Sequence, residues 1–378
     1  MNSSSTLPFL DLHRQYINLQ PEIESAIKVV CEKTAFSGGY FVEKFESEFA
    51  NFCQSKYCVG LSNGTSALHL AMLALGIGKG DEVILPANTF IASAWGPAQA
   101  GAKPVFADCD PQTWNLDPAS VEKKITPRTK AIIGVHLYGL PCAIEELQKI
   151  CRHHKLFFIE DAAQAQGARF KQKPVGSFGD ISCFSFYPGK NLGAYGEAGA
   201  ITTHNAKYAK IIRCLRDQGS YKKYHHVMIG YNERMDGIQA AILSTKLKYL
   251  NQWNQRRQFI LQAYRSGIKQ ESIQFQHFPT HTYSACHLAV ISVKNRDKWN
   301  DHFHSLGIFP GCHYPIPCHL QKAFSYLKYR SGSLPVAESL SKHCISLPLF
   351  PEMTDTEVER VISALNSFPV KTKIKKLK

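Results

Sequence analysis

Apolar residues occur in the first part of the chain as short runs that are bounded by polar or glycine-rich stretches. Runs of this length, ending in turn-forming residues, are typical of buried β-strands. The predicted strands are Tyr57–Ser62, Glu82–Pro86, Pro104–Cys109, Ala131–Leu137, Leu156–Asp161, Ile181–Tyr187 and Ala198–Thr203.

Helical patterns separate several of these strands, because apolar residues recur at helical spacing in Ser66–Leu75, Phe90–Ala98 and Ala143–His154. Strands that alternate with helices predict an α/β protein with a mostly parallel sheet covered by helices on both faces. The last two strands differ, because only about ten glycine-rich residues join them and a parallel crossover needs more. We therefore predict a seven-stranded sheet in which Ala198–Thr203 runs antiparallel.

The rest of the chain predicts a second, smaller α+β domain. Its expected elements are a long helix from Asp236 to about Ser266, a strand-like run at Ala285–Val293, an amphipathic segment at Arg296–Leu306 and a final helix at Asp355–Leu365. We expect a large domain of residues 1–250, whose N-terminal segment packs on the small domain, and a small C-terminal domain of residues 251–378.

Composition and charge narrow the class of protein. The chain has 378 residues, of which 44% are hydrophobic and 20% charged, as in a soluble globular protein. The net charge is +14, and the last residues, VKTKIKKLK, are rich in lysine. A nucleic-acid-binding arm and an ordinary solvated terminus both fit this tail, and we favour the latter. A positive field would also attract an anionic substrate such as a nucleotide diphosphate.

The sequence also indicates a compartment. No apolar run approaches the roughly 20 residues that span a bilayer, and the N-terminus lacks the pattern of a signal peptide, so we predict a cytoplasmic protein with no membrane partner. The scattered cysteines favour reduced, mostly buried thiols over a disulfide framework. Cys312-His313 and Cys318-His319 have no CxxC spacing beside them, so we expect no metal.

One lysine has a sequence context that indicates chemistry. Lys190 leaves the apolar strand Ile181–Tyr187 through Pro188 and Gly189, which should hold its amine in a fixed place, partly out of water. Desolvation disfavours the ammonium form and lowers the pKa of the amine. A neutral amine can form a Schiff base with an aldehyde. An ordinary surface lysine is the alternative.

Further polar residues are expected at the same edge of the sheet, where the parallel strands end and ligands bind. Asp161 ends a strand as either a paired buried carboxylate or a helix cap. Gly64 and Thr65 open a helix whose free amides could bind phosphate, although such turns are common. Phe90 offers a ring for stacking or for core packing, and Gln164 offers a donor one turn beyond Asp161.

Together these residues meet the requirements of pyridoxal phosphate: an anion site, a ring clamp, a carboxylate for the pyridinium nitrogen and a lysine for the Schiff base. In this hypothesis Asp161 keeps the ring nitrogen protonated. Lys190 moves the α-proton of the substrate as general base and acid. We therefore predict pyridoxal 5'-phosphate as the cofactor.

Five long motifs resemble one known family. They are SNGTSALHLAMLALGIGKGDEVILPANTFIASA, VHLYG, EDAAQAQGA, FSFYPGKNLGAYGEAG and IGYNERMDGIQAAIL. They look like the DegT/DnrJ/StrS family of nucleotide-sugar aminotransferases, and the resemblance runs from Pro8 to about Leu365. It implies the aspartate-aminotransferase fold (fold type I), with a seven-stranded sheet that has one antiparallel strand.

The resemblance implies roles for the cofactor residues. Lys190 would attach the cofactor, Asp161 would pair with the pyridine nitrogen and Gln164 would reach the ring hydroxyl. The phosphate would be held by Gly64, Thr65 and Ser185, and Phe90 would stack on the ring. Asn232 is similar to an asparagine that reaches the cofactor phosphate of the neighbouring subunit, which implies a homodimer with shared sites.

The resemblance also implies a substrate. The chain most closely resembles the subgroup that aminates dTDP-3-keto-6-deoxyhexoses with glutamate as amino donor. The product of that reaction is an amino sugar for polysaccharide or glycoconjugate biosynthesis. In that subgroup the sugar nucleotide is contacted by residues that match Tyr187, Lys223, His313 and Tyr314. A 4-keto sugar aminotransferase is the alternative within the family, and a non-catalytic regulatory or nucleic-acid-binding protein is the alternative outside it. The intact set of Lys190, Asp161 and Ser185 argues against the latter.

Overall fold

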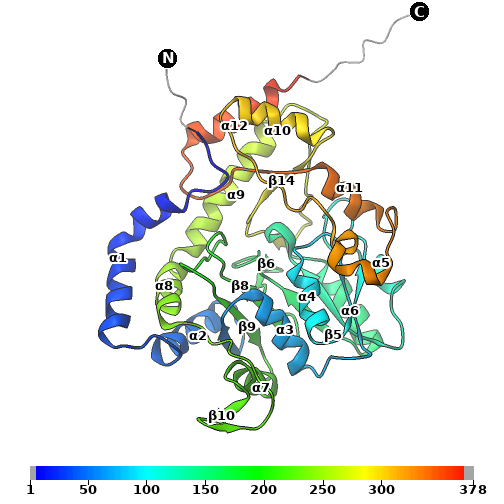
Figure 1. The fold of residues 1–378 in the computed structure, drawn as a ribbon. Helices are drawn as coiled ribbons and strands as arrows, with labels where there is room; N and C mark the ends of the chain where they lie inside the picture. The colour runs from blue at the N-terminus through cyan, green and yellow to red at the C-terminus, as the bar shows by residue number, and fades with distance from the viewer. Residues whose placement is uncertain (1–5, 370–378) are drawn as a thin grey trace, which may run out of the picture.

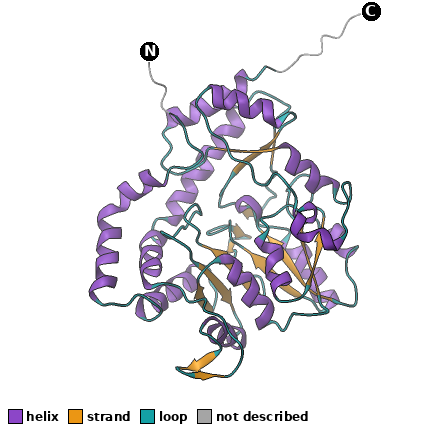
Figure 2. Cartoon of the chain, viewed as in Figure 1, coloured by secondary structure: helices purple, strands orange, loops and turns teal. Residues whose placement is uncertain are grey.

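The computed structural model describes residues 6–369, and a seven-stranded sheet lies at its centre (Figures 1 and 2). All seven predicted strands are present. In spatial order they are β1 (Tyr57–Leu61), β9 (Gly199–Thr203), β8 (Ile181–Ser185), β5 (Phe157–Asp161), β4 (Thr129–Val135), β2 (Glu82–Pro86) and β3 (Lys103–Ala107).

The direction of the last strand is confirmed. β9 lies antiparallel to both of its neighbours, with Ile201 opposite Val59 of β1 and Cys183 of β8. The other neighbouring pairs of strands are parallel. The short link between β8 and β9 holds no helix that could carry the chain back across the sheet, so the chain can only return in the opposite direction.

Helices cover both faces of the sheet (Figure 2), because residues along each strand alternate between the two sides. In β5, Ile159 packs with the core beneath α3 (Gly64–Ala74) and α4 (Ala92–Gln99), whereas Phe158 packs on the opposite side with α6 (Ile144–His154). Towards the β1 edge, that opposite side is covered by α2 (Tyr40–Phe52) and α8 (Gly237–Leu247), and α7 (Ala206–Arg216) packs on the same side as α3.

A separate hydrophobic cluster is built around a small antiparallel sheet of β12 (Gln274–Phe275), β14 (Ala289–Ser292) and β15 (Cys344–Leu347). Leu7 belongs to this cluster and forms a bridge with Ile308, so the N-terminal segment packs on the C-terminal part of the chain. The helices of this cluster are α9 (Leu250–Gly267), α10 (Arg296–Ser305) and α12 (Asp355–Ser367). In contrast, α11 (Pro335–His343) packs with the core beneath α3, and α1 (Leu12–Glu32) packs against α8. The domain boundary at residue 250 stays a prediction.

Two expectations for the C-terminal part were wrong in detail. The single long helix is two helices, α8 and α9, because α8 packs into the core beside β8 and β9 whereas most of α9 packs into the cluster around β14. The strand run from Ala285 is also shorter, since β14 begins only at Ala289. Before it, the N–H groups of Ala285 and His287 donate to the carbonyls of Gly139 and Tyr138 instead of a neighbouring strand.

The cysteines are all free thiols, as predicted, and all except Cys31 and Cys312 are buried. Across residues 6–369, no helix combines the length and hydropathy needed to cross a bilayer. The same residues contain no cluster of three or more side chains suited to hold a metal ion. The lysine-rich tail, residues 370–378, lies outside the described residues.

Candidate active site

The carboxyl ends of β5 and β8 bring Asp161 and Lys190 together. Asp161 is the last residue of β5, and Lys190 follows β8 by a turn in which its N–H donates to the Tyr187 carbonyl at 2.8 Å. Because β5 and β8 are parallel neighbours, both side chains lie at one edge of the sheet. The pairing of this lysine with this carboxylate was the central prediction from the sequence.

The Lys190 amine is enclosed by protein although part of the residue is accessible to solvent. Desolvation lowers the pKa of Lys190 to about 8, and the charge of Asp161 opposes this shift. At pH 7 about a tenth of the amine is therefore neutral and nucleophilic, far more than for an ordinary lysine. Two nearby histidines stay uncharged, because burial and the Lys190 charge lower the pKa of His313 to about 4 and hold that of His287 well below its ordinary value.

Asp161 is held in position by a short chain of hydroxyls. The Ser93 Oγ donates to Asp161 Oδ2 at 2.6 Å, and Ser93 in turn bonds to the Thr89 hydroxyl at 2.8 Å. The other carboxylate oxygen accepts the Ala163 N–H at 3.2 Å. A carboxylate has about four lone-pair positions, so Asp161 keeps the capacity to accept one further N–H, as a protonated ring nitrogen requires.

The start of α3 forms an anion cradle. Asn63 caps the helix, with its Oδ1 accepting the Ser66 N–H at 2.8 Å, which leaves the Gly64 and Thr65 N–H groups without an acceptor in the described part of the chain. A Cβ added at Gly64 would lie 2.6 Å from the Ser185 Cβ. Only glycine therefore lets α3 approach Ser185 closely, and the free N–H groups beside the Ser185 hydroxyl are donors of the kind that bind a phosphate.

Aromatic and amide groups line the side of the site opposite the sheet. Phe90 is 50% exposed, and its ring lies 5.6 Å from the Tyr314 ring. Gln164 accepts the Tyr138 N–H at 2.7 Å and donates to the Tyr314 hydroxyl at 3.0 Å. His313, beside Tyr314, bonds through Nδ1 to the Ser346 Oγ at 2.8 Å. The fold thus brings residues from the C-terminal part of the chain to the cofactor residues.

Three predicted residues lie towards solvent. Tyr187 is 54% exposed at the edge of the site. Lys223 lies at the tip of the hairpin β10 (Ser220–Lys222) and β11 (His225–His226), which projects from the body of the molecule (Figure 1). Asn232 is exposed, and its backbone forms an isolated antiparallel β-bridge with Asp217. Within residues 6–369 neither Lys223 nor Asn232 contacts the other predicted site residues, as expected if both serve a second subunit.

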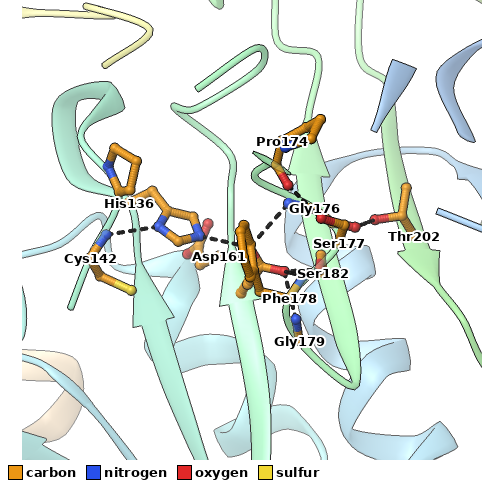
Figure 3. A network of polar contacts seen from close by, with 12 residues as sticks. His136, Cys142, Asp161, Pro174, Gly176, Ser177, Phe178, Gly179, Ser182 and Thr202 are labelled. Atoms are coloured by element: carbon orange, nitrogen blue, oxygen red, sulfur yellow. Dashed lines mark hydrogen bonds and ion pairs between the residues drawn. The ribbon is translucent and has the colours of Figure 1, made fainter. Parts of the chain in front are cut away.

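Glu160, the residue before Asp161, is a fully buried carboxylate surrounded by donors. Figure 3 shows the polar network to which the donors His136, Gly176 and Ser182 belong. It accepts hydrogen bonds from the N–H groups of Gly176, Phe178 and Gly179, from the Ser182 hydroxyl and from His136 Nε2, at 2.5–3.1 Å. His136 Nδ1 accepts the Cys142 N–H at 3.0 Å, so the ring hydrogen lies on Nε2. Burial alone would raise the pKa of Glu160, but these donors outweigh it and lower the pKa.

Glu160→Ala should lower the free energy of unfolding by about 3–5 kcal/mol, because five buried donors lose their acceptor. In the wild type, the Glu160 contribution should be fully present above its unfolded pKa near 4.5 and be lost progressively as pH falls from there through its folded pKa of about 2. Denaturant titrations between about pH 2 and pH 7 measure both effects. Glu122→Ala, at an exposed position, is the control and should leave stability within about 0.5 kcal/mol.

Sequence reasoning missed Ser93, Thr89 and Gln166. Ser93 lies in the first turn of α4 and Thr89 lies four residues earlier in the link after β2, and this spacing of two hydroxyls after a strand end was the available signal. Gln166 donates to the Ser185 carbonyl at 2.6 Å and so ties the loop after β5 to the end of β8. No local pattern marks Gln166, because its partner is distant in the sequence.

Comparisons with known proteins agree with this geometry. Residues 18–366 match the model of the DegT/DnrJ/EryC1/StrS aminotransferase family. The chain is 46% identical to a dTDP-3-amino-3,6-dideoxy-alpha-D-galactopyranose transaminase of Aneurinibacillus thermoaerophilus, over 96% of this chain and 99% of that protein. It is 41% identical, over 96% and 98%, to a protein of Geobacillus stearothermophilus called a pleiotropic regulatory protein.

Solved structures are also similar. A crystal structure of DesV from Streptomyces venezuelae in complex with a ketimine intermediate matches with a TM-score of 0.94 and 40% identity, covering 96% of this chain and 98% of that chain. Matched structures include one of ntda from Bacillus subtilis with bound cofactor PMP. The Asp161–Lys190 edge, the α3 cradle and the reversed β9 thus belong to a fold shared with these proteins.

Proposed function

The chain belongs to the DegT/DnrJ/EryC1/StrS aminotransferase family, whose cofactor is pyridoxal phosphate, and from this premise we propose that it aminates a dTDP-linked 3-keto-6-deoxyhexose with glutamate as amino donor. The observation that carries the choice of substrate is the full-length 46% identity to a dTDP-3-amino sugar transaminase. The product is an amino sugar for polysaccharide or glycoconjugate biosynthesis.

Each cofactor residue then has a task that its surroundings allow. Gly64, Thr65 and Ser185 bind the phosphate, Phe90 covers the ring and Gln164 reaches the ring hydroxyl. When bound, pyridoxal phosphate supplies an electron sink for the negative charge left at the carbon that loses its proton. Asp161, fixed by Ser93, keeps a proton on the ring nitrogen.

Lys190 has two tasks in this proposal. Its amine would hold the cofactor covalently between reactions, and the same amine, when free, would accept and return the proton at the substrate carbon. A pKa of about 8 suits both tasks, since neutral and protonated forms are each accessible near neutral pH. His313 and Tyr314 are half-buried and would limit the access of water to the side of the site that faces the sugar.

We further propose that two chains build each site. Tyr187, His313 and Tyr314 would contact the sugar nucleotide bound in their own subunit, whereas Lys223 and Asn232 would enter the site of a neighbouring copy. The exposure of Lys223 and Asn232 and the projection of the β10–β11 hairpin, which carries Lys223, support this arrangement. Free thiols throughout the chain suit a reducing compartment, which supports a cytoplasmic location.

Asn232→Ala should weaken retention of the cofactor by about tenfold, because one hydrogen bond to a phosphate is lost. The dissociation constant of pyridoxal phosphate measures this, with the exposed Asn251→Ala as control. Hybrid dimers of one Lys190→Ala chain and one Asn232→Ala chain give a sharper test at limiting cofactor. If two chains share each site, one site of the hybrid receives both Lys190 and Asn232 from unmutated positions, and activity is restored. If each site is built within one chain, both sites of the hybrid are defective, and an inactive hybrid would refute sharing.

A panel of keto sugars tests the substrate. The holoenzyme is incubated with glutamate and with 3-keto and 4-keto sugars linked to dTDP, UDP or GDP, and products are identified by mass spectrometry and NMR. We expect amination at C3 of the dTDP-linked 6-deoxy sugar. Amination only of 4-keto sugars would establish the alternative within the family. No amination together with tight, sequence-selective DNA binding would favour a regulatory protein, for which one relative's name is the specific support.

A further inference from the structure

Two thiols touch beside the predicted sugar-binding residues. The Sγ atoms of Cys312 and Cys344 lie 3.7 Å apart, where the segment around Gly311 pairs with β15 through two hydrogen bonds of 2.8 Å to Ser346. Cys312 is half-buried, whereas Cys344 is 1% exposed. Among the cysteines, Cys312 therefore combines access to small reagents with a second thiol in contact.

A cation also faces this pair. The Arg296 guanidinium lies with its Nη1 3.2 Å from Cys312 Sγ and 2.6 Å from the Ser341 carbonyl. A positive charge at this distance stabilises a thiolate, and the thiolate is the reactive form of cysteine. The other part-accessible thiol, Cys31 on α1, has no such neighbour among the described residues.

We propose that Cys312 and Cys344 form a reversible redox pair, in which hydrogen peroxide oxidises Cys312 and Cys344 then closes a disulfide. Neither thiol takes part in amino transfer, and the redox reaction of the pair is separate from that chemistry.

The two steps balance. The Cys312 thiolate attacks one peroxide oxygen and the O–O bond breaks, which gives a sulfenic acid and hydroxide. The Cys344 sulfur then attacks the Cys312 sulfur, the S–O bond breaks, and the leaving oxygen takes the Cys344 proton and departs as water. Sulfur loses two electrons in total and peroxide gains them. A dithiol such as dithiothreitol reverses the change by exchange.

The protonation of the two thiols agrees with oxidation of Cys312 first and attack by Cys344 second. A hydrogen bond from Cys344 and the charge of Arg296 lower the pKa of Cys312 to about 7 against the effect of burial. The same hydrogen bond and burial raise the pKa of Cys344, so Cys344 keeps its proton until Cys312 has been oxidised.

The disulfide should affect the sugar side of the site, a consequence that rests on the proposed function. A disulfide requires a sulfur separation of about 2.05 Å, so its closure draws Cys312 towards β15. His313 is the next residue and is bonded to Ser346 of β15, and Tyr314 holds Gln164. We expect oxidation to raise the KM for the keto sugar more than it lowers kcat with glutamate.

Peptide mapping of the peroxide-treated holoenzyme tests the pair without relying on activity. We expect a linked peptide that joins Cys312 to Cys344, removed by dithiothreitol. Cys344→Ser should stop at a sulfenic acid that dimedone traps on residue 312, Cys312→Ser should give neither product, and Cys31→Ser should still form the link. Arg296→Gln should slow alkylation of Cys312 at pH 7 by about tenfold while leaving Cys31 unchanged, because the thiolate fraction falls.

Two results would overturn the proposal. One is the absence of the linked peptide when Cys31 is already oxidised. The other is equal reactivity of Cys312 with and without Arg296. Because these readouts are chemical, they fail separately from the proposed function: an enzyme inactive on every keto sugar can still form the link, and an active enzyme can lack it. A linked enzyme with an unchanged KM for the keto sugar would overturn the coupling to the site.

Discussion

Replacing Lys190 with alanine should abolish transamination, with a loss of about 10³-fold or more in kcat, because the substitution removes both the covalent tether and the group that moves the proton. The purified variant should also lack the visible absorbance and the borohydride-reducible linkage of the bound cofactor. Steady-state kinetics with glutamate and the keto sugar, together with peptide mapping after borohydride treatment, measure the two losses.

Lys246 provides a matched control, since it is a second buried amine. Burial lowers the pKa of Lys246 to about 7, yet its Nζ donates to the Gly193 carbonyl. If a lowered pKa alone determined cofactor attachment, borohydride would label both lysines. We expect the label on Lys190 only, and retention of that label in Lys246→Met. A label that persists in Lys190→Ala, with turnover, would disprove the assignment.

The same amine predicts a pH dependence. A pKa lowered from 10.5 to about 8 means that the neutral form of Lys190 increases as pH rises through 8. Attachment of pyridoxal phosphate to the apoprotein should therefore become faster between pH 6.5 and pH 8.5 and then level off, because only the neutral amine attacks the aldehyde. Stopped-flow absorbance measures this rate.

Asp161→Asn should lower kcat by about 10²-fold or more while leaving much of the cofactor bound, since the substitution removes a charge and little volume. The amide oxygen can still accept the Ala163 N–H, and the Ser93 hydroxyl can turn to accept from the amide nitrogen. The local fold should therefore survive, and the loss reports the missing negative charge opposite the ring nitrogen.

The rate of the half-reaction with glutamate and the cofactor content together measure the effect of Asp161→Asn. Ser93→Ala is the graded control: it removes one donor and keeps the charge, so we expect a loss of about tenfold or less. Equal losses in the two variants would mean that geometry rather than charge matters. A wild-type rate in Asp161→Asn would contradict the role of the carboxylate.

Local pattern alone was enough for the sheet and for the centre of the site. Each strand has an apolar run that ends in turn residues, and the short link before β9 leaves the chain no room for a parallel return. Asp161 and Lys190 could be placed together because both follow strands whose carboxyl ends meet at one edge. The same reasoning placed Gly64, Thr65, Phe90 and Gln164 at this edge, and the family motifs then added Ser185 and Asn232 to the prediction.

Other features depend on contacts between distant segments. The helical period continues through residues 248 and 249, but α8 and α9 separate because they bury their apolar faces in different clusters. Ser93 acquires its role only when α4 packs beside β5, which places its hydroxyl on Asp161. Contact between Cys312 and Cys344 likewise arises from the pairing of two segments that no local pattern relates.

Periodicity and turn chemistry act over a few residues, so they specify elements, their order and the ends of strands. Side-chain contacts across the fold depend on how those elements pack, and packing is set by the shape of the whole core. The candidate cofactor residues could therefore be predicted from the amino-acid order. The hydroxyl chain behind Asp161, the donors around Glu160 and the thiol pair beside His313 were decided only by the folded molecule.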